Sequence, residues 1–329
     1  MTADLVATLT GRATRPWGVG GTDLGIPVVL ANGDIGYFLG DTFASARAGG
    51  RNWRSPVLLR GPATDPAAGI RFTSAAGGRR ARQILPNRRD RRELPRIEAP
   101  GTEFTVVPSD AVTIGARTYL SVVSVHSWRA QRWMSNFTYL AYSDDSGASW
   151  ELSPARWDNR PGALDQHWTM ERDGGFVYVV SSAFGRAAGD GAILRRVRED
   201  RILDPAAYEP WGFEDAAGWR WGAPATPFLP GPFGEMSLRR VGGLWVLAYF
   251  DPAAYAIVTR TAERVDGRWS EPRIQVRGGA WGDRDGSYAQ IYGGFVHPLS
   301  TPDDLHLIVS QWNTRRGKPY HVLHFRGRL

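Results

Sequence analysis

Short apolar runs rich in Val, Tyr, Phe and Trp recur along the whole chain, and clusters of Gly, Asn, Asp and Pro separate them. Runs of about four to eight such residues, bounded by turn residues, are typical of β-strands. We find no convincing long segment with the 3.6-residue periodicity of an amphipathic helix. The pattern therefore predicts an all-β fold.

The predicted strands form five similar modules. In each module a strand with a polar head leads through a turn into a very apolar strand that ends in polar residues. The modules lie at residues 21–43, 101–128, 165–186, 234–251 and 287–313. Repeats of about 40 to 65 residues, each a small antiparallel sheet, indicate the blades of a β-propeller. We predict one five-bladed β-propeller domain over residues 1–329, with an Arg-rich loop insertion at about residues 75–100.

The heads of the modules are expected to converge, because the innermost strands of a propeller begin at one rim of a central funnel, where the second strands end. The polar residues at these positions are Asp23, Asp41, Glu103, His126, His167, Arg186, Glu235, Asp251, Gln290, Gln311 and Asn313. Such groups beside aromatic rings suit a neutral polyhydroxylated ligand, since sugar faces stack on indoles while hydroxyls bind polar groups.

Two carboxyl groups lie on one predicted hairpin of the first module. Asn32-Gly33 supplies the turn, and counting outward from it places Asp23 opposite residue 42 or 43, close to Asp41. Two carboxyl groups at the same end of a hairpin can act as the acid and the base that hydrolyse a glycosidic bond. The alternative is that each Asp only caps a turn or accepts backbone N–H bonds.

Glu235 is a third carboxyl at a module head. Beside the apolar Phe233, Met236 and Leu238, its pKa could be raised, as a general acid requires. The alternative is a strand-end Glu paired with Arg239 or Arg240.

Tryptophan is frequent, with 14 residues in the chain. Trp17, Trp53, Trp128, Trp168, Trp281 and Trp312 flank the expected pocket. We assign about two-thirds of all the tryptophans to the core or to blade interfaces. Trp53, Trp128 and Trp312 are the candidates for exposed rings beside polar heads.

The segment Ser143 to Trp150, SDDSGASW, fits the Asp-box pattern S-x-D-x-G-x-x-W. Its side chains can hold a hairpin turn in which Gly147 takes the positive-φ position and Trp150 packs back on the blade. We interpret it as structural. Asp-box propellers include sialidases, but the three carboxylate-binding arginines and the Tyr-Glu pair of that chemistry cannot be placed in this sequence.

Composition narrows the function classes. The chain has no cysteine, and its six histidines show no metal-binding spacing, so we expect no metal in the site. No apolar run approaches the length of a membrane span, and the first residues lack the pattern of an export signal, so we expect a soluble protein with no membrane insertion. The net charge of +7 comes almost wholly from arginine. The cluster from Arg79 to Arg96 is either a salt-bridged loop or a docking surface for an anionic polymer, and no nucleic-acid motif accompanies it.

Several ordered segments carry a family resemblance: GTDLGIPV, GDTF followed by NWRSPVLL, YLAYSDDSGASW, FGEMSLRR, and YGGFVHPLS with LIVSQWN. Together they resemble the signature segments of the actinobacterial endo-D-arabinanases of glycoside hydrolase family 183, over roughly residues 17 to 326. The Arg79 to Arg96 stretch matches least well.

The resemblance implies a five-bladed propeller that cleaves internal linkages of D-arabinofuranosyl polymers, the arabinan of mycobacterial arabinogalactan and lipoarabinomannan. It implies that Asp23 and Asp41 are the catalytic acids, and we infer that Glu235 is a pKa modulator or an alternative acid. The candidate substrate-binding residues are Trp53, Arg54, Glu103, His126, Trp128, His167, Arg186, Tyr288, Gln290, Gln311, Trp312 and Asn313. We expect no cofactor, and leave open whether Ca²⁺ or Na⁺ occupies the funnel.

The expected partner is a cell-wall polysaccharide, and the expected location is extracellular or on a virion. The main alternative is a non-catalytic glycan-binding propeller, such as the receptor-binding tip of a phage. A sialidase-like glycosidase is a second alternative.

Overall fold

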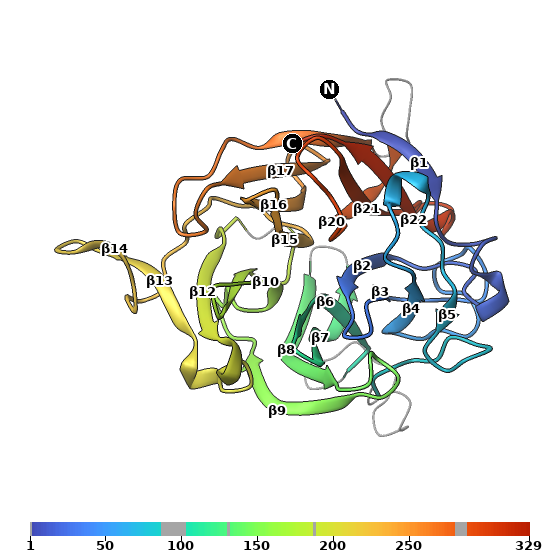
Figure 1. Ribbon diagram of the computed structural model, residues 1–329, viewed down its shortest axis with the longest axis horizontal. Coiled ribbons are helices and arrows are strands. Elements are labelled where there is room, and N and C mark those ends of the chain that lie inside the picture. Colours follow the sequence, from blue (N-terminus) through green and yellow to red (C-terminus); the bar gives the residue numbers. More distant parts are fainter. Residues whose placement is uncertain (1, 87–102, 130–131, 187–188, 280–287) are drawn as a thin grey trace.

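The computed structural model describes residues 2–86, 103–129, 132–186, 189–279 and 288–329. Its strands form five sheets arranged as the blades of a ring (Figure 1). The predicted all-β, five-bladed propeller is confirmed. Helical structure in the described part is confined to four 3-10 turns: η1 (Arg15–Trp17), η2 (Pro66–Ala68), η3 (Glu199–Arg201) and η4 (Pro205–Ala207). No described helix has the length and apolar character that crossing a membrane requires.

The first two blades have four strands each. Blade 1 contains β2 (Leu24–Val29), β3 (Ile35–Leu39), β4 (Val57–Gly61) and β5 (Ser74–Ala75). Blade 2 contains β6 (Thr105–Ile114), β7 (Arg117–Arg129), β8 (Arg132–Ser143) and β9 (Glu151–Asp158). In both blades, consecutive strands pair antiparallel.

Blades 3 and 4 each add a fifth strand. Blade 3 contains β10 (His167–Asp173), β11 (Phe176–Ser182), β12 (Ile193–Arg198), β13 (Glu209–Glu214) and β14 (Gly218–Trp221). Blade 4 contains β15 (Met236–Val241), β16 (Leu244–Asp251), β17 (Ala256–Ala262), β18 (Arg273–Gly279) and the short β19 (Tyr288–Ala289), which pairs parallel to β18. The β13–β14 hairpin projects from the ring (Figure 1).

Blade 5 is built from both ends of the chain. It contains β20 (Ile291–Val296), β21 (Leu305–Trp312), β22 (Tyr320–Gly327) and, on its outer edge, β1 (Asp4–Thr8). The pairing of β1 with β22 is antiparallel, with Asp4 opposite Arg326. The ring is therefore closed by backbone hydrogen bonds between its first and last strands.

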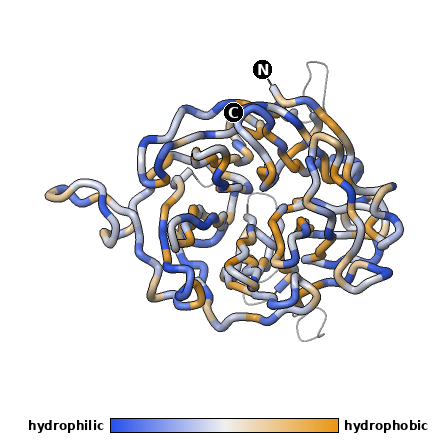
Figure 2. Tube along the Cα trace, viewed as in Figure 1, coloured by the Kyte–Doolittle hydropathy of each residue, from blue (hydrophilic) through white to orange (hydrophobic). Residues whose placement is uncertain are grey.

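The core lies in the inner strands and between neighbouring blades. Residues of β3 and β15 such as Phe38 and Leu238 are fully buried. Apolar and polar residues alternate along the strands of the ring (Figure 2). One cluster joins blades 1, 2, 4 and 5. Burial of these apolar faces, at about 25 cal/mol per Å², drives the packing of blade on blade.

The register of the first hairpin differs from the expected one. Val29 pairs with Ile35, so the turn spans residues 30–34 instead of the two residues Asn32 and Gly33, although Gly33 has the expected positive φ of 86°. A bulge at Leu24 and Gly25, both at positive φ, shifts the register again. The backbone carbonyl of Asp23 therefore accepts from Gly40, not from residue 42 or 43.

The Asp-box segment forms the predicted hairpin turn between β8 and β9. The hydroxyl of Ser143 donates to Asp145 and accepts from the backbone N–H of Gly147, which has a φ of 82°. The ring of Trp150 packs edge-on against Phe38 of blade 1 at 5.5 Å. Of the Arg-rich insertion, residues 87–102 lie outside the described residues, while Arg79 and Arg80 are exposed.

Candidate active site

Asp23 lies directly before β2, at the rim where the innermost strands begin. Its Oδ2 accepts a hydrogen bond from the hydroxyl of Tyr292 at 2.9 Å, whereas its Oδ1 is buried and has no hydrogen-bond partner among the described residues. Burial and then repulsion from Asp41 raise the pKa of Asp23 from 3.8 to about 7, although hydrogen bonds from Tyr320 and Tyr292 act in the opposite direction. At neutral pH a substantial fraction of this carboxyl is therefore protonated.

Asp41 follows β3 and is held by donors from two blades. Its Oδ1 accepts from the indole Nε1 of Trp53 at 2.6 Å and from the hydroxyl of Thr105, the first residue of β6, at 3.0 Å. These donors stabilise a charged carboxylate. The effect of Asp41 on the pKa of Asp23 shows that the two groups lie within electrostatic reach of each other.

Glu235 lies directly before β15, at the same rim. Its Oε1 accepts two hydrogen bonds from the guanidinium of Arg186, and its Oε2 accepts from the backbone N–H of Gly293 at 3.3 Å. Burial is the largest single influence and favours a raised pKa, but the charges of Arg186 and His167 together with the hydrogen bonds from Arg186 outweigh it, so the pKa of Glu235 is lowered. The expectation of a raised pKa is therefore wrong, and the alternative, a pairing with Arg239 or Arg240, is wrong as well, because the partner is Arg186.

Arg186 is enclosed by aromatic rings as well as paired with Glu235. Its guanidinium lies 4.5 Å from the ring centres of Trp133 and Tyr292 and 5.3 Å from that of Phe250. Such stacking and ion pairing hold the guanidinium in place. Arg186 thus connects blade 3, which carries it, to blades 2, 4 and 5.

His167 begins β10 and is buried. Burial lowers its pKa, although the charge of Glu235 acts in the opposite direction, so the imidazole is neutral at pH 7. Neutral imidazole both donates and accepts hydrogen bonds, which suits a hydroxyl-rich ligand.

Three predicted residues of blade 2 form a second polar and aromatic group. Glu103 accepts from the hydroxyl of Ser124 at 2.7 Å, and His126 contacts Asn136 through Nδ1 at 3.0 Å. The ring of Trp128 packs edge-on against Trp133 at 5.0 Å. Because Trp133 also lies over Arg186, this group is continuous with the carboxyl site.

The other predicted residues have local partners. Arg54 donates to the backbone carbonyls of Asn52, Ala81 and Gly18. Tyr288 packs edge-on against Phe325, Gln290 bonds to Thr314, and Asn313 accepts from the N–H of Arg316. Trp312 is half-buried near Tyr320, next to Gln311 at the end of β21. Trp168 is fully buried between Trp157 and Tyr208, so it belongs to the core, and Trp281 lies outside the described residues.

Sequence reasoning missed four residues that contact the carboxyl groups: Thr105, Tyr292, Tyr320 and Gly293. Tyr292 stands two residues after Gln290, so strand alternation from that head could have found it. Nothing local singles out Tyr320, which approaches Asp23 only because the chain returns to the rim at the start of β22.

The opposite end of the ring contains a cavity of about 410 Å³. It is lined by residues where inner strands end, among them Val29, Thr113, Glu171 and Arg239. Arg239 is engaged there by the buried Asp110, at 2.7 and 2.8 Å. The acidic triad of Asp23, Asp41 and Glu235 therefore belongs to the other end, where the strands begin.

The fold and this site define an all-β propeller with three carboxyl groups gathered at one rim. The chain belongs to the family described as Domain of unknown function (DUF4185), which matches residues 9–326.

Among curated proteins, it is 37% identical over 314 residues to "Notoamide biosynthesis cluster protein J'" of Aspergillus versicolor, covering 91% of this chain and 83% of that protein. It is 27% identical over 339 residues to an uncharacterized 35.9 kDa protein of Mycolicibacterium smegmatis, covering 96% and 95%. Among solved structures, the GH43_1 enzyme from Xanthomonas citri complexed with xylotriose is similar. That match has a TM-score of 0.57 and 14% identity, and it covers 99% of this chain and 90% of that chain. At that identity the match concerns the fold.

Proposed function

We propose that this protein is a glycosidase that hydrolyses internal linkages of a D-arabinofuranosyl polymer. The observation that carries the proposal is a buried carboxyl, Asp23, with a pKa of about 7, close to a second carboxyl, Asp41, whose two hydrogen-bond donors favour its ionised form. A glycosidase needs such a pair, one group protonated and the other ionised at the same pH.

In the proposed reaction the proton of Asp23 passes to the glycosidic oxygen as the bond from that oxygen to the anomeric carbon breaks. Asp41 stabilises the positive charge that develops on the sugar, and either removes a proton from the attacking water or attacks the anomeric carbon itself. Glu235, kept ionised by Arg186, raises the pKa of Asp23 and so acts as the modulator.

The proposed specificity for a D-arabinofuranosyl polymer rests on the family resemblance and on the residues that surround Asp23 and Asp41. The indole of Trp53 and the group of Glu103, His126 and Trp128 offer stacking and hydrogen-bonding partners for sugars beside the carboxyl pair. The similar fold of an enzyme that binds xylotriose supports a saccharide ligand. Such a substrate would place the protein outside the cell or on a virion, with no cofactor needed for the reaction.

The test is incubation with mycobacterial-type arabinogalactan, with released oligosaccharides separated by chromatography. We expect products from the wild type and a loss of several orders of magnitude in Asp23→Asn and in Asp41→Asn. Asp34→Asn, in the exposed turn of the same hairpin, is the matched control and should keep full activity. Binding of the polymer without products would instead support a glycan-binding propeller, and wild-type rates in both site variants would refute the assigned acids.

The relative named for notoamide biosynthesis favours a second candidate, in which the same carboxyl pair acts as acid and base on a small molecule that is not a saccharide. A folded wild type that neither binds nor cleaves arabinan would favour this candidate.

A further inference from the structure

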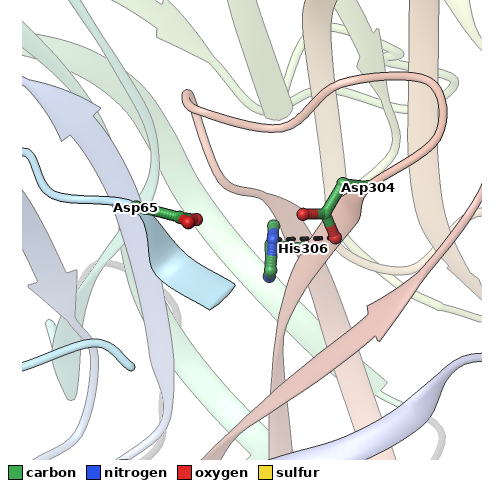
Figure 3. A group of neighbouring side chains, drawn as sticks. All are labelled: Asp65, Asp304 and His306. Atoms are coloured by element: carbon green, nitrogen blue, oxygen red, sulfur yellow. Dashed lines mark ion pairs between the residues drawn. The ribbon is translucent and has the colours of Figure 1, made fainter. Parts of the chain in front are cut away.

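Three side chains with metal-binding donor atoms gather far from the carboxyl pair, at the end of the ring where the inner strands finish. Asp65 follows β4 and caps η2, Asp304 lies in the turn before β21, and His306 is the second residue of β21. Their donor atoms all lie within 4.8 Å of one another. Figure 3 shows the imidazole of His306 between the two carboxylates, which come from blade 1 on one side and blade 5 on the other.

The imidazole of His306 is oriented for such a role. Its side chain is only 1% exposed, and its Nδ1 lies 2.8 Å from Nε2 of His324. Its Nε2 lies 3.1 Å from Oδ1 of Asp304, an ion-pair contact whose geometry falls short of a hydrogen bond. If Nδ1 donates to His324, the free lone pair of a neutral ring stands on Nε2. A metal-binding histidine is commonly fixed in this way through its other nitrogen.

The two carboxylates are also suitably arranged. Asp65 is exposed and accepts from the N–H of Ala67 through Oδ1 at 2.9 Å, which leaves Oδ2 available. Asp304 accepts from Nε and Nη2 of Arg326 at 2.6 and 3.1 Å. Arg326 fixes the Asp304 carboxylate, as outer partners of metal ligands do, and two carboxylates with one guanidinium leave a net negative charge for a cation.

We propose that Asp65, Asp304 and His306 bind one divalent transition-metal ion of the zinc class. One imidazole nitrogen with two carboxylate oxygens is a zinc-type donor set, whereas Ca²⁺ and Mg²⁺ favour oxygen ligands alone. Zinc-to-ligand distances are about 2.0 to 2.2 Å, so the three donor atoms must move slightly closer to one another when the ion binds. Asp65 can supply that movement, because it stands in an exposed connection.

The position gives the ion a structural role, because it would join the first blade to the last. That seam is where the ring closes, through the β1–β22 pairing and through a hydrogen bond between Tyr37 of β3 and His297 after β20 at 3.0 Å. A metal ligated from both sides binds only the closed ring, and its binding free energy therefore adds to the stability of the folded state. The reaction at the carboxyl pair would not involve it.

The test uses the full chain without an affinity tag, stripped with a chelator and titrated with ZnCl₂ by calorimetry and metal analysis. We expect one Zn²⁺ per chain, and a Kd at least about tenfold weaker in Asp65→Asn and in His306→Gln. Asp204→Asn is the matched control, because Asp204 also caps a 3-10 turn by accepting from the N–H of Ala206. It should bind Zn²⁺ like the wild type.

Zn²⁺ should also raise the Tm of the wild type and of Asp204→Asn, but not that of Asp65→Asn. In Asp65→Asn the side-chain oxygen of Asn can still cap η2, so circular dichroism should show an intact fold. Absence of bound Zn²⁺ in the wild type would overturn the proposal, as would equal binding in Asp65→Asn. Displacement of Zn²⁺ by equimolar Ca²⁺ or Mg²⁺ would overturn the metal class.

Discussion

Replacing Asp23 with Asn should stabilise the protein at neutral and alkaline pH. The folded state raises the pKa of this carboxyl from 3.8 to about 7. Between these values the folded chain keeps a proton that the unfolded chain releases, so the stability contributed by this group falls as pH rises through this window. One pKa unit corresponds to about 1.4 kcal/mol, so the full loss is about 4 kcal/mol.

The Asn side chain introduced by Asp23→Asn would be neutral at every pH, and its amide oxygen could still accept the hydrogen bond from Tyr292. Below about pH 4 the variant and the wild type should have similar free energies of unfolding, because Asp23 is then protonated in both states. Above about pH 7 the variant should be the more stable by up to about 4 kcal/mol. The same substitution should abolish activity. The residue whose ionised carboxylate destabilises the fold would then also be a residue that the reaction requires.

The assay is urea unfolding of both proteins from about pH 4 to about pH 8, followed by tryptophan fluorescence, with Asp34→Asn as control. Titrating groups that do not interact with Asp23 are common to both proteins, so their effects cancel in the difference, whereas the responses of Asp41 and Glu235 are part of the measured effect. A stability difference between Asp23→Asn and the wild type that does not change with pH would refute the burial and repulsion that we assign to Asp23.

Three further outcomes follow from the site and from the core. If Asp23 is the acid, kcat/KM on arabinan should fall about tenfold per pH unit above about pH 7, and a flat profile from about pH 6 to 9 would contradict this role. In Arg186→Gln, Glu235 loses its cation, and burial should then keep Glu235 neutral. Without that negative charge the pKa of Asp23 should be lower, so the alkaline limb of the pH–rate profile should move to lower pH. Arg196→Gln loses a similar ion pair with Glu and a similar stacking contact with Trp away from the site, and should leave the profile unchanged. Arg239→Leu leaves the fully buried Asp110 without its cation, and should lower the free energy of unfolding in urea by about 3 to 5 kcal/mol. Arg198→Leu, at an exposed ion pair, should lower it by less than about 1 kcal/mol. Equal losses in the two variants would contradict the burial argument.

The chain sequence determined the blades, because strand formation and turns depend on neighbouring residues. The five polar-headed modules map onto the first two strands of the five sheets, and the positive φ of Gly33 and Gly147 stands where the turn residues predicted it. Asp23, Asp41 and Glu235 could be selected as candidates for the same reason, since each stands at the polar end of an apolar strand.

The tertiary structure decided which of these groups meet and what charge they carry. Tyr292 binds Asp23 across 269 residues of sequence, and Arg186 reaches Glu235 from a different blade. The longer turn and the bulge at Leu24 each moved Asp23 by one residue relative to its partner strand. Protonation depends on burial and on charges brought together through space, so no local pattern could assign a pKa of about 7 to Asp23 or a lowered one to Glu235. Ring closure by β1 and the gathering of Asp65, Asp304 and His306 likewise exist only once the first and last blades are in contact.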